Sequence, residues 1–254
     1  MKITKYNIQT TKPNINLKIA VVADLHAKQP YPVISAINNI KPDVILCAGD
    51  IFECFEDKNS KINENGFEFF NQSVKIAPTY YCFGNHEIEG EICNDYPEIS
   101  GYKSIPPHIT ERLANLGVHT VFDSYVLLHE NIAIGGLLSG AHRNYGMPNI
   151  DFVDKFSSIS QYKILICHHP EYYEKYLTNK DIDMILSGHA HGGQWRFFGR
   201  GIFAPSQGLF PKYTSGVHDG RLIISCGCSN NTRPIKVPRL FNPKEVLSIE
   251  ITSK

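Results

Sequence analysis

Carboxylate, amide and imidazole side chains recur directly after short apolar segments of this sequence. Five apolar segments end in this way, at 19–23, 44–48, 79–83, 164–167 and 184–187. The polar residues that follow them are Asp24, His26, Asp50, Asn85, His86, His168, His189 and His191. Carboxylates and imidazoles together bind borderline divalent cations such as Zn, Fe, Mn or Ni. The residue types therefore predict a metal site, if the fold brings the five segments together.

The number of candidate ligands favours two ions over one. Seven or eight ligands are too many for one tetrahedral ion, and no cluster of cysteines indicates a structural zinc site. Two divalent ions about 3.5 to 4 Å apart would use all of them, and a hydroxide shared by the ions could attack phosphorus in line. A single Asp-x-His or His-x-His is usually a capped turn or a surface loop. Five such clusters at strand ends predict a binuclear hydrolytic site.

The elements that must position these residues alternate in the N-terminal half. Apolar segments at 19–23, 44–48 and 79–83 alternate with amphipathic segments at 33–40 and 67–76, a β-α-β-α-β order. Such an order predicts a parallel sheet, whose strands end at a common edge where ligands bind.

The second half is richer in strands, so we expect two packed sheets flanked by helices. Strand composition occurs at 118–122, 125–128, 132–137, 164–167, 184–187, 222–226 and 247–251, and helices are plausible at 110–115 and 152–159.

Composition narrows the class of protein further. The 254 residues contain no repeat or long linker, which predicts a single domain over 1–254. Twenty-five basic and 25 acidic side chains give a formal charge of zero, so we expect no extended nucleic acid as partner. No apolar run has the length of a membrane span, and residues 1–13 do not resemble a signal peptide. The chain has seven cysteines, an odd number that cannot all pair in disulfides within the chain. Together, these features predict a cytoplasmic protein.

These motifs, in their order along the chain, resemble the motifs of the calcineurin-like metallophosphoesterase superfamily. The resemblance covers about 19–193. The resemblance implies a four-layer α/β/β/α sandwich, with two mixed β-sheets flanked by helices. It also implies one metal ion held by Asp24, His26, Asp50 and His191, and a second held by Asp50, Asn85, His168 and His189. Asp50 would bridge the ions. An amidohydrolase-type barrel is disfavoured, because its His-x-His belongs to the first strand and here it follows the last of the five.

The resemblance also implies roles in catalysis. His86 would contact the phosphate with Asn85, stabilise its charge in the transition state and protonate the leaving oxygen. Glu53 stands where the superfamily commonly has an Asp that orients this histidine. Cys54 follows, where protein Ser/Thr phosphatases carry an Arg, which argues against a phosphoprotein substrate.

Flanking motifs at 188–194, 204–206 and 238–245 are similar to the bacterial YkuE-like branch. Relatives there are phosphodiesterases or lipid-linked pyrophosphatases, often at a membrane surface, so a small phosphodiester or a lipid-linked phosphate is the expected substrate. The segment 135–143 departs from the Gly-x-Asp-Asp element of that branch. Two alternatives stay open, a nucleotide or nucleic-acid phosphodiesterase and a non-catalytic metal-binding scaffold.

An aromatic segment follows the last candidate ligands. Its large apolar residues are Trp195, Phe197, Phe198, Phe203, Leu209 and Phe210, and basic residues are interspersed among them. Either this segment forms an apolar wall or lip with peripheral membrane contact, or it is buried under a sheet edge.

Overall fold

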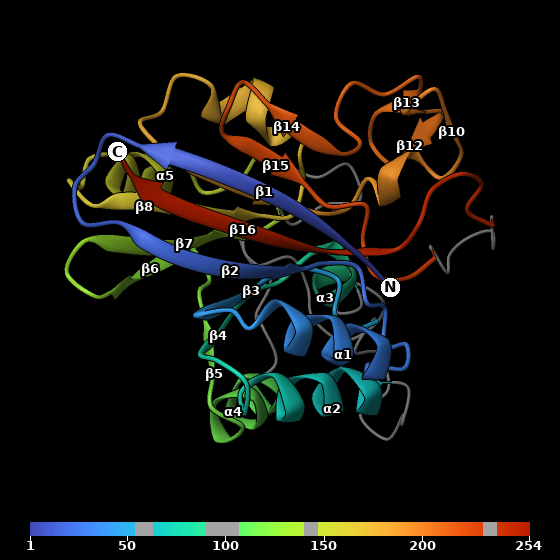
Figure 1. Cartoon of the computed structure of the whole chain (residues 1–254), viewed down its shortest axis with the longest axis horizontal. Coiled ribbons are helices and arrows are strands. Elements are labelled where there is room, and N and C mark those ends of the chain that lie inside the picture. Colours follow the sequence, from blue (N-terminus) through green and yellow to red (C-terminus); the bar gives the residue numbers. More distant parts are fainter. Residues whose placement is uncertain (54–62, 90–106, 140–146, 231–237) are drawn as a thin grey trace, which may run out of the picture.

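Two six-stranded mixed sheets form the centre of the computed structural model, which describes residues 1–53, 63–89, 107–139, 147–230 and 238–254 (Figure 1). The first sheet has, in spatial order, β1 (Lys2–Thr10), β16 (Glu245–Ser253), β2 (Asn16–Val22), β3 (Val44–Ala48), β4 (Thr79–Cys82) and β5 (Val118–Thr120). The second has β14 (Gly216–His218), β15 (Leu222–Ile224), β9 (Met184–Ser187), β8 (Tyr162–Cys167), β7 (Ile132–Leu137) and β6 (Ser124–Leu128).

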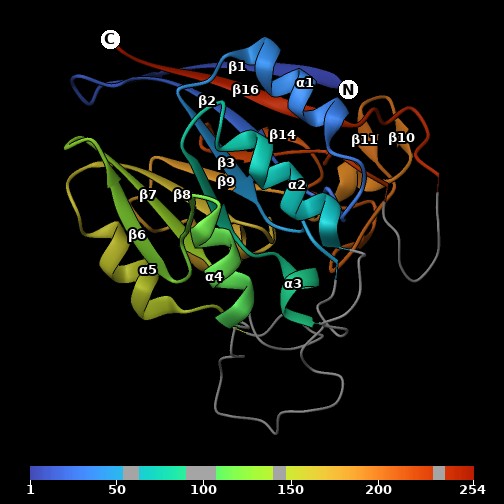
Figure 2. The ribbon, with the colours of Figure 1, turned by 90° about the horizontal axis from the view of Figure 1, so that it is seen from below.

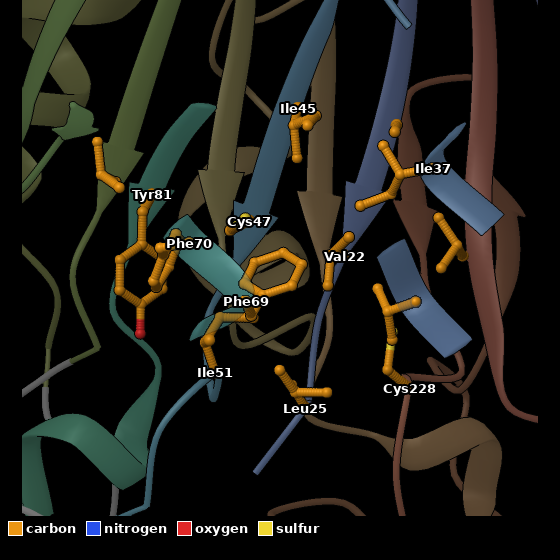
Figure 3. Packing of buried hydrophobic residues seen from close by; sticks show 14 of the residues in the cluster. Val22, Leu25, Ile37, Ile45, Cys47, Ile51, Phe69, Phe70, Tyr81 and Cys228 are labelled. Atoms are coloured by element: carbon orange, nitrogen blue, oxygen red, sulfur yellow. The ribbon is translucent and has the colours of Figure 1, made fainter. Parts of the chain in front are cut away.

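Alternating side chains create three hydrophobic layers around these sheets. Val21 and Leu46 of the first sheet pack against residues such as Ile164 of the second, which forms the inner core. On the opposite face of the first sheet, residues such as Ile45 pack beneath α1 (Tyr31–Ile40), α2 (Glu64–Ser73) and α4 (Pro107–Asn115) (Figure 2). Figure 3 shows this outer core, with Ile37 of α1 and Phe70 of α2 beside the strands.

The outer face of the second sheet is covered by α5 (Ile150–Ser157) and a π-helical turn, Tyr173–Leu177. Phe152, Val153 and Phe156 of α5 are buried there. The order of layers is therefore helix, sheet, sheet, helix, and the predicted four-layer sandwich is confirmed.

Parallel pairing brings the polar loops to one edge. β2, β3 and β4 are mutually parallel neighbours in the first sheet, and β7, β8 and β9 are parallel neighbours in the second. Each of the five predicted strands that precede the polar clusters is present within a few residues of its expected bounds. Short α3 (Asn85–Glu89) begins shortly after β4 and carries two of the eight polar residues, Asn85 and His86.

The first strand, β1, was not predicted from the sequence. It pairs along its whole length with the C-terminal β16, and the next strand inward is β2. It is an edge strand whose residues are all exposed or half-buried, so its few apolar residues do not form the continuous run of a central strand.

Two small hairpins lie in the aromatic segment: β10 (Arg196–Phe197) with β11 (Arg200–Gly201), and β12 (Phe203–Ala204) with β13 (Gly208–Leu209). The expectations about Cys54 and about 140–143 fall outside the described residues. Within the described parts of the chain, no helix has both the length and the apolar character that a membrane crossing requires.

Candidate metal centre

Backbone hydrogen bonds join the polar loops at the carboxyl ends of the strands. The amide of Asp24 donates to the carbonyl of Gly49 (3.1 Å), and the amide of His26 donates to the carbonyl of Asp50 (2.9 Å). Between the sheets, the amide of His189 donates to Asp24 Oδ1 (3.0 Å). The eight residues that follow the five strands therefore meet in one region, and all of them except the half-buried His86 are buried.

The backbone at this edge is locally strained. Five candidate ligands have positive φ angles, which non-glycine residues rarely adopt: Asp24 (55°), His26 (51°), Asp50 (53°), His189 (67°) and His191 (46°). Gly84 allows the loop after β4 to approach the loop after β3 closely. A Cβ at this position would lie only 2.2 Å from Asp50 Oδ1. Strain of this kind persists where the surrounding structure enforces it, and it concentrates at functional sites.

Asp24, His26 and His191 form a first group, with ligand atoms that all lie within 4.8 Å of one another. The Nε2 atoms of His26 and His191 are 3.3 Å apart, and His191 Nε2 is 3.7 Å from Asp24 Oδ1. Asp24 Oδ2 is buried and has no hydrogen-bond partner among the described residues. Two imidazoles and a carboxylate that converge in this way, with one oxygen unsatisfied, fit a divalent cation.

Asp50, His168 and His189 form a second group. His168 Nδ1 donates to the carbonyl of Ala48 (2.6 Å), so its Nε2 faces Asp50 Oδ2 at 3.1 Å. A hydrogen bond of this kind from the other ring nitrogen is what orients metal-binding histidines. Although burial opposes the charge, Asp50 raises the pKa of His168 to about 10. The carboxylate of Asp50 is correspondingly held well below its usual pKa, against the effect of burial, by His168 and His86.

Asp50 lies between the two groups. Its Oδ2, 3.1 Å from His168 Nε2, is also 3.9 Å from His26 Nε2, a member of the first group. Asn85 directly precedes His86, and its Oδ1 is buried and forms no hydrogen bond within the described structure, so this amide oxygen is available as a further ligand. The donor set therefore fits two cations that share the carboxylate of Asp50.

His86 and Glu53 form a pair beside these groups. His86 Nδ1 lies 2.9 Å from Glu53 Oε2, and His86 Nε2 lies 4.0 Å from Asp50 Oδ2. Burial disfavours the imidazolium, but Asp50 and then Glu53 raise the pKa of His86 to about 9. Glu53 Oε1 is also 3.4 Å from His26 Nδ1, so this longer side chain contacts two histidines at once.

Glu87 has a structural role that the sequence analysis did not assign. Its buried carboxylate accepts hydrogen bonds from the amides of Asp50 (3.0 Å), Phe52 (3.0 Å) and Gly84 (2.8 Å), and from the hydroxyl of Tyr81 (2.5 Å). It thereby joins the loop after β3 to the loop after β4. The only signal in the sequence is its position after Gly84-Asn85-His86.

His169 and Glu171 were also missed, and they adjoin the second group. His169 Nδ1 is 3.1 Å from Glu171 Oε1, and the rings of His169 and His189 are 4.1 Å apart. With His189, these two residues form a further group of potential ligands. A histidine directly after His168 and a glutamate two residues later gave no distinct pattern.

Comparisons with known proteins identify the family of this chain. A profile of the calcineurin-like phosphoesterase family matches residues 17–193, and the chain belongs to this family. It is 28% identical to an uncharacterized metallophosphoesterase of Campylobacter jejuni over 95% of the chain and 61% of that protein. It is 26% identical to the phosphodiesterase YaeI of Escherichia coli over 70% of the chain and 62% of that protein. The chain thus spans about three fifths of the length of these relatives.

A crystal structure of TT1561 from Thermus thermophilus is similar with a TM-score of 0.43 and 12% identity, over 68% of this chain and 82% of that one. Family membership and the grouped histidines and carboxylates define a metal-dependent phosphoesterase.

Proposed function

We propose that this phosphoesterase is a binuclear phosphodiesterase. The single observation that supports it best is the position of Asp50 Oδ2 next to histidines of both groups. One ion would be held by Asp24, His26, Asp50 and His191, and the other by Asp50, Asn85, His168 and His189. Two divalent ions in these positions supply a nucleophile at neutral pH and neutralise the charge of the phosphate oxygens. Mn, Fe, Zn and Ni are the candidate ions.

In this proposal, His86 is the principal catalytic side chain of the protein. Glu53, which contacts its Nδ1, favours the protonated imidazole, and in that form His86 can donate a hydrogen bond to a phosphate oxygen as negative charge develops. The same proton can pass to the leaving oxygen, which a diester requires because an alkoxide is a poor leaving group. Glu53 orients the ring through Nδ1, and leaves Nε2 directed at the substrate.

The relatives favour a diester over a monoester as substrate. The Escherichia coli protein is named a phosphodiesterase, and the flanking motifs of this chain are similar to the YkuE-like branch. A nucleotide diester is the second candidate, and a non-catalytic metal-binding scaffold is the third. We further propose that residues 1–254 act as one domain, because β1 and β16, from the two ends of the chain, pair in one sheet.

The aromatic segment supports a peripheral membrane contact and a lipid-linked phosphate substrate. The structure exposes all six of its large apolar residues, with Phe198 and Phe210 at 105% and 77% of their full accessibility, so burial under a sheet edge is the wrong alternative. Phe241, 72% exposed, packs against Phe197 from the segment before β16. Exposed apolar patches next to a site often mark binding surfaces, and Arg200 beside them suits anionic headgroups.

Hydrolysis by reconstituted protein tests the proposed activity. Chelator-treated protein is titrated separately with Mn, Zn, Fe(II) and Ni, and cleavage of bis-p-nitrophenyl phosphate is compared with cleavage of p-nitrophenyl phosphate. The proposal expects diester cleavage to return at about two metal equivalents. Stoichiometric metal binding without turnover of any diester would instead support a scaffold.

Sedimentation with phosphatidylcholine vesicles, with and without phosphatidylglycerol, tests the membrane contact. Phe198→Ser with Phe210→Ser should abolish binding and leave cleavage of the soluble diester unchanged. If the wild-type protein stays in the supernatant with both kinds of vesicle, the contact with membranes is wrong.

A further inference from the structure

A half-buried arginine, Arg239, lies next to the first group of ligands. Arg239 Nη2 is 3.3 Å from His191 Nδ1 and donates a hydrogen bond to the carbonyl of Ser229. Nε2 of the same imidazole faces Asp24 and His26. The guanidinium is therefore separated from the other ligands of the first group by one imidazole ring.

The segment that carries Arg239 is fixed on both sides of it. Trp195 Nε1 donates to the carbonyl of Pro238 (2.9 Å), and the amide of Arg196 donates to the carbonyl of Leu240 (2.9 Å). Asn242 Nδ2 donates to the carbonyl of His191 (2.7 Å). These bonds join the segment to the loop that contains the candidate ligand His191. They hold the backbone of Arg239 in place relative to the metal centre.

The hydrogen-bonding capacity of Arg239 is only partly used. Nε and Nη1 are both shielded from solvent and have no hydrogen-bond partner in the described parts of the chain. A guanidinium stays charged at any physiological pH, and an unpaired buried charged donor is costly. The carboxylates that act on it are Asp24, a candidate metal ligand, and Glu245, whose oxygens bond with Thr4 and the amide of Cys226.

We propose that Arg239 binds a second phosphoryl group of the substrate, next to the phosphate held at the metal centre. The inference rests on the proposed function and deepens it, because it names a substrate with two phosphoryl groups. A guanidinium matches the geometry and charge of a phosphate, and an anion would supply acceptors for Nε and Nη1. The separation by the His191 ring places this contact beyond the phosphate that reacts. The second phosphoryl group is linked to the reacting phosphate either directly, by an anhydride, or through another alcohol of the substrate that is esterified close to it.

Direct binding distinguishes these possibilities. Calorimetry with metal-loaded protein compares three probes: thymidine 5′-phosphate, thymidine 5′-diphosphate and thymidine 3′,5′-bisphosphate. We expect the wild-type protein to bind the diphosphate or the bisphosphate about tenfold or more tightly than the monophosphate. The tighter of the two identifies the linkage. Arg239→Gln should remove this preference and change the affinity for the monophosphate less than about threefold.

Two further variants control for charge and structure. Arg239→Lys keeps the charge but offers fewer donors, and should retain part of the preference. Lys41→Gln removes one exposed positive charge at the C-terminal end of α1, close to the start of β3 and so at the opposite edge of the sheet, and should match the wild type. Metal content is measured for every variant and should be unchanged.

Three results would overturn the proposal: equal affinity of the wild type for all three probes, an equal loss for all three in Arg239→Gln, or a loss of metal in both Arg239 variants. The last two would make Arg239 a support of His191. A wild-type protein that prefers a doubly phosphorylated probe but cleaves no diester would contradict the proposed activity and leave the role of Arg239 standing.

Discussion

Buried polar groups at opposite ends of strand β8 differ in how completely they are satisfied. At the start of the strand, Lys163 is fully buried, and its Nζ donates to the carbonyls of Ser157 (3.1 Å) and Ile159 (3.0 Å) and to Asp181 Oδ2 (2.7 Å). Beyond the end of the strand, His168 belongs to a cluster in which buried oxygens such as Asp24 Oδ2 have no hydrogen-bond partner within the described structure.

The difference separates a structural role from a functional one. An ammonium group has three donors, and Lys163 has an acceptor for each, so its cluster is complete without a ligand. The cluster at the carboxyl edge is incomplete, because Asp24 Oδ2 and Asn85 Oδ1 have no donor within the described structure and a cation would satisfy them. Substitutions at one end of β8 should therefore affect stability, and substitutions at the other should affect metal binding and turnover.

Asp50→Asn should have the largest effect, because this carboxylate lies between both groups of ligands. We expect diester turnover to fall by at least about a thousandfold, since loss of ion binding removes several kcal/mol of transition-state stabilisation. Metal analysis should show less than one equivalent. His191→Ala is the matched comparison, because it affects one group and should keep about one equivalent. Full occupancy in Asp50→Asn would refute its bridging position.

His86→Ala should reduce turnover about a hundredfold or more while both metal equivalents remain, because proton transfer and not ion binding is lost. The effect should be largest for diesters with poor leaving groups, which need protonation most. Rates on a nitrophenyl ester and on an alkyl ester of the same phosphate provide the measurement. Unchanged turnover of the alkyl ester would exclude His86 as the general acid.

Lys163→Met should lower the free energy of unfolding by about 1 to 3 kcal/mol, because the carbonyls of Ser157 and Ile159 lose their donor. Asp181 is exposed and regains water, which limits the cost. Urea denaturation measures the change, and metal content and turnover at 25 °C should match the wild type. A loss of metal with unchanged stability would reverse the roles assigned to the two ends of β8.

Asp181→Asn should have the smallest effect, and one that depends on pH. The hydrogen bond with Lys163 is the main reason that the pKa of Asp181 lies below its ordinary value in the folded protein. Because the pKa of Asp181 is lower in the folded protein than in the unfolded protein, its ionised form stabilises the fold at pH values above the unfolded-state pKa. This contribution disappears as pH falls through the folded-state pKa. The difference between wild type and variant should be within about 1 kcal/mol near pH 7 and should disappear as pH falls below the folded-state pKa of Asp181. A difference that stays constant throughout the acid range in which the protein remains folded would exclude a charge interaction.

The central part of the fold was predictable because its signals are local. Apolar segments that end in Asp, Asn or His are visible in the sequence, and parallel pairing then determines that their ends meet. The grouping of the candidate ligands in space followed from the same pattern. Strand β1 was not predictable in this way, because a half-exposed edge strand is defined by its partner β16 more than by its own composition.

The supporting residues were harder to predict than the candidate ligands. Glu87 contacts Phe52, which is 35 residues away in the chain, and Arg239 contacts His191, which is 48 residues away. Their residue types are common on protein surfaces, and only the structure shows that their polar atoms are buried. The exposure of the aromatic segment was equally hidden, because its composition also fits a buried loop.

Anomalous diffraction from crystals soaked in Mn²⁺ tests the central claim most directly, because it locates ions independently of activity. The account predicts two manganese peaks, one among Asp24, His26 and His191 and one among Asn85, His168 and His189, with Asp50 between them. Peaks at neither group, or a single ion held by His169 and Glu171, would contradict it.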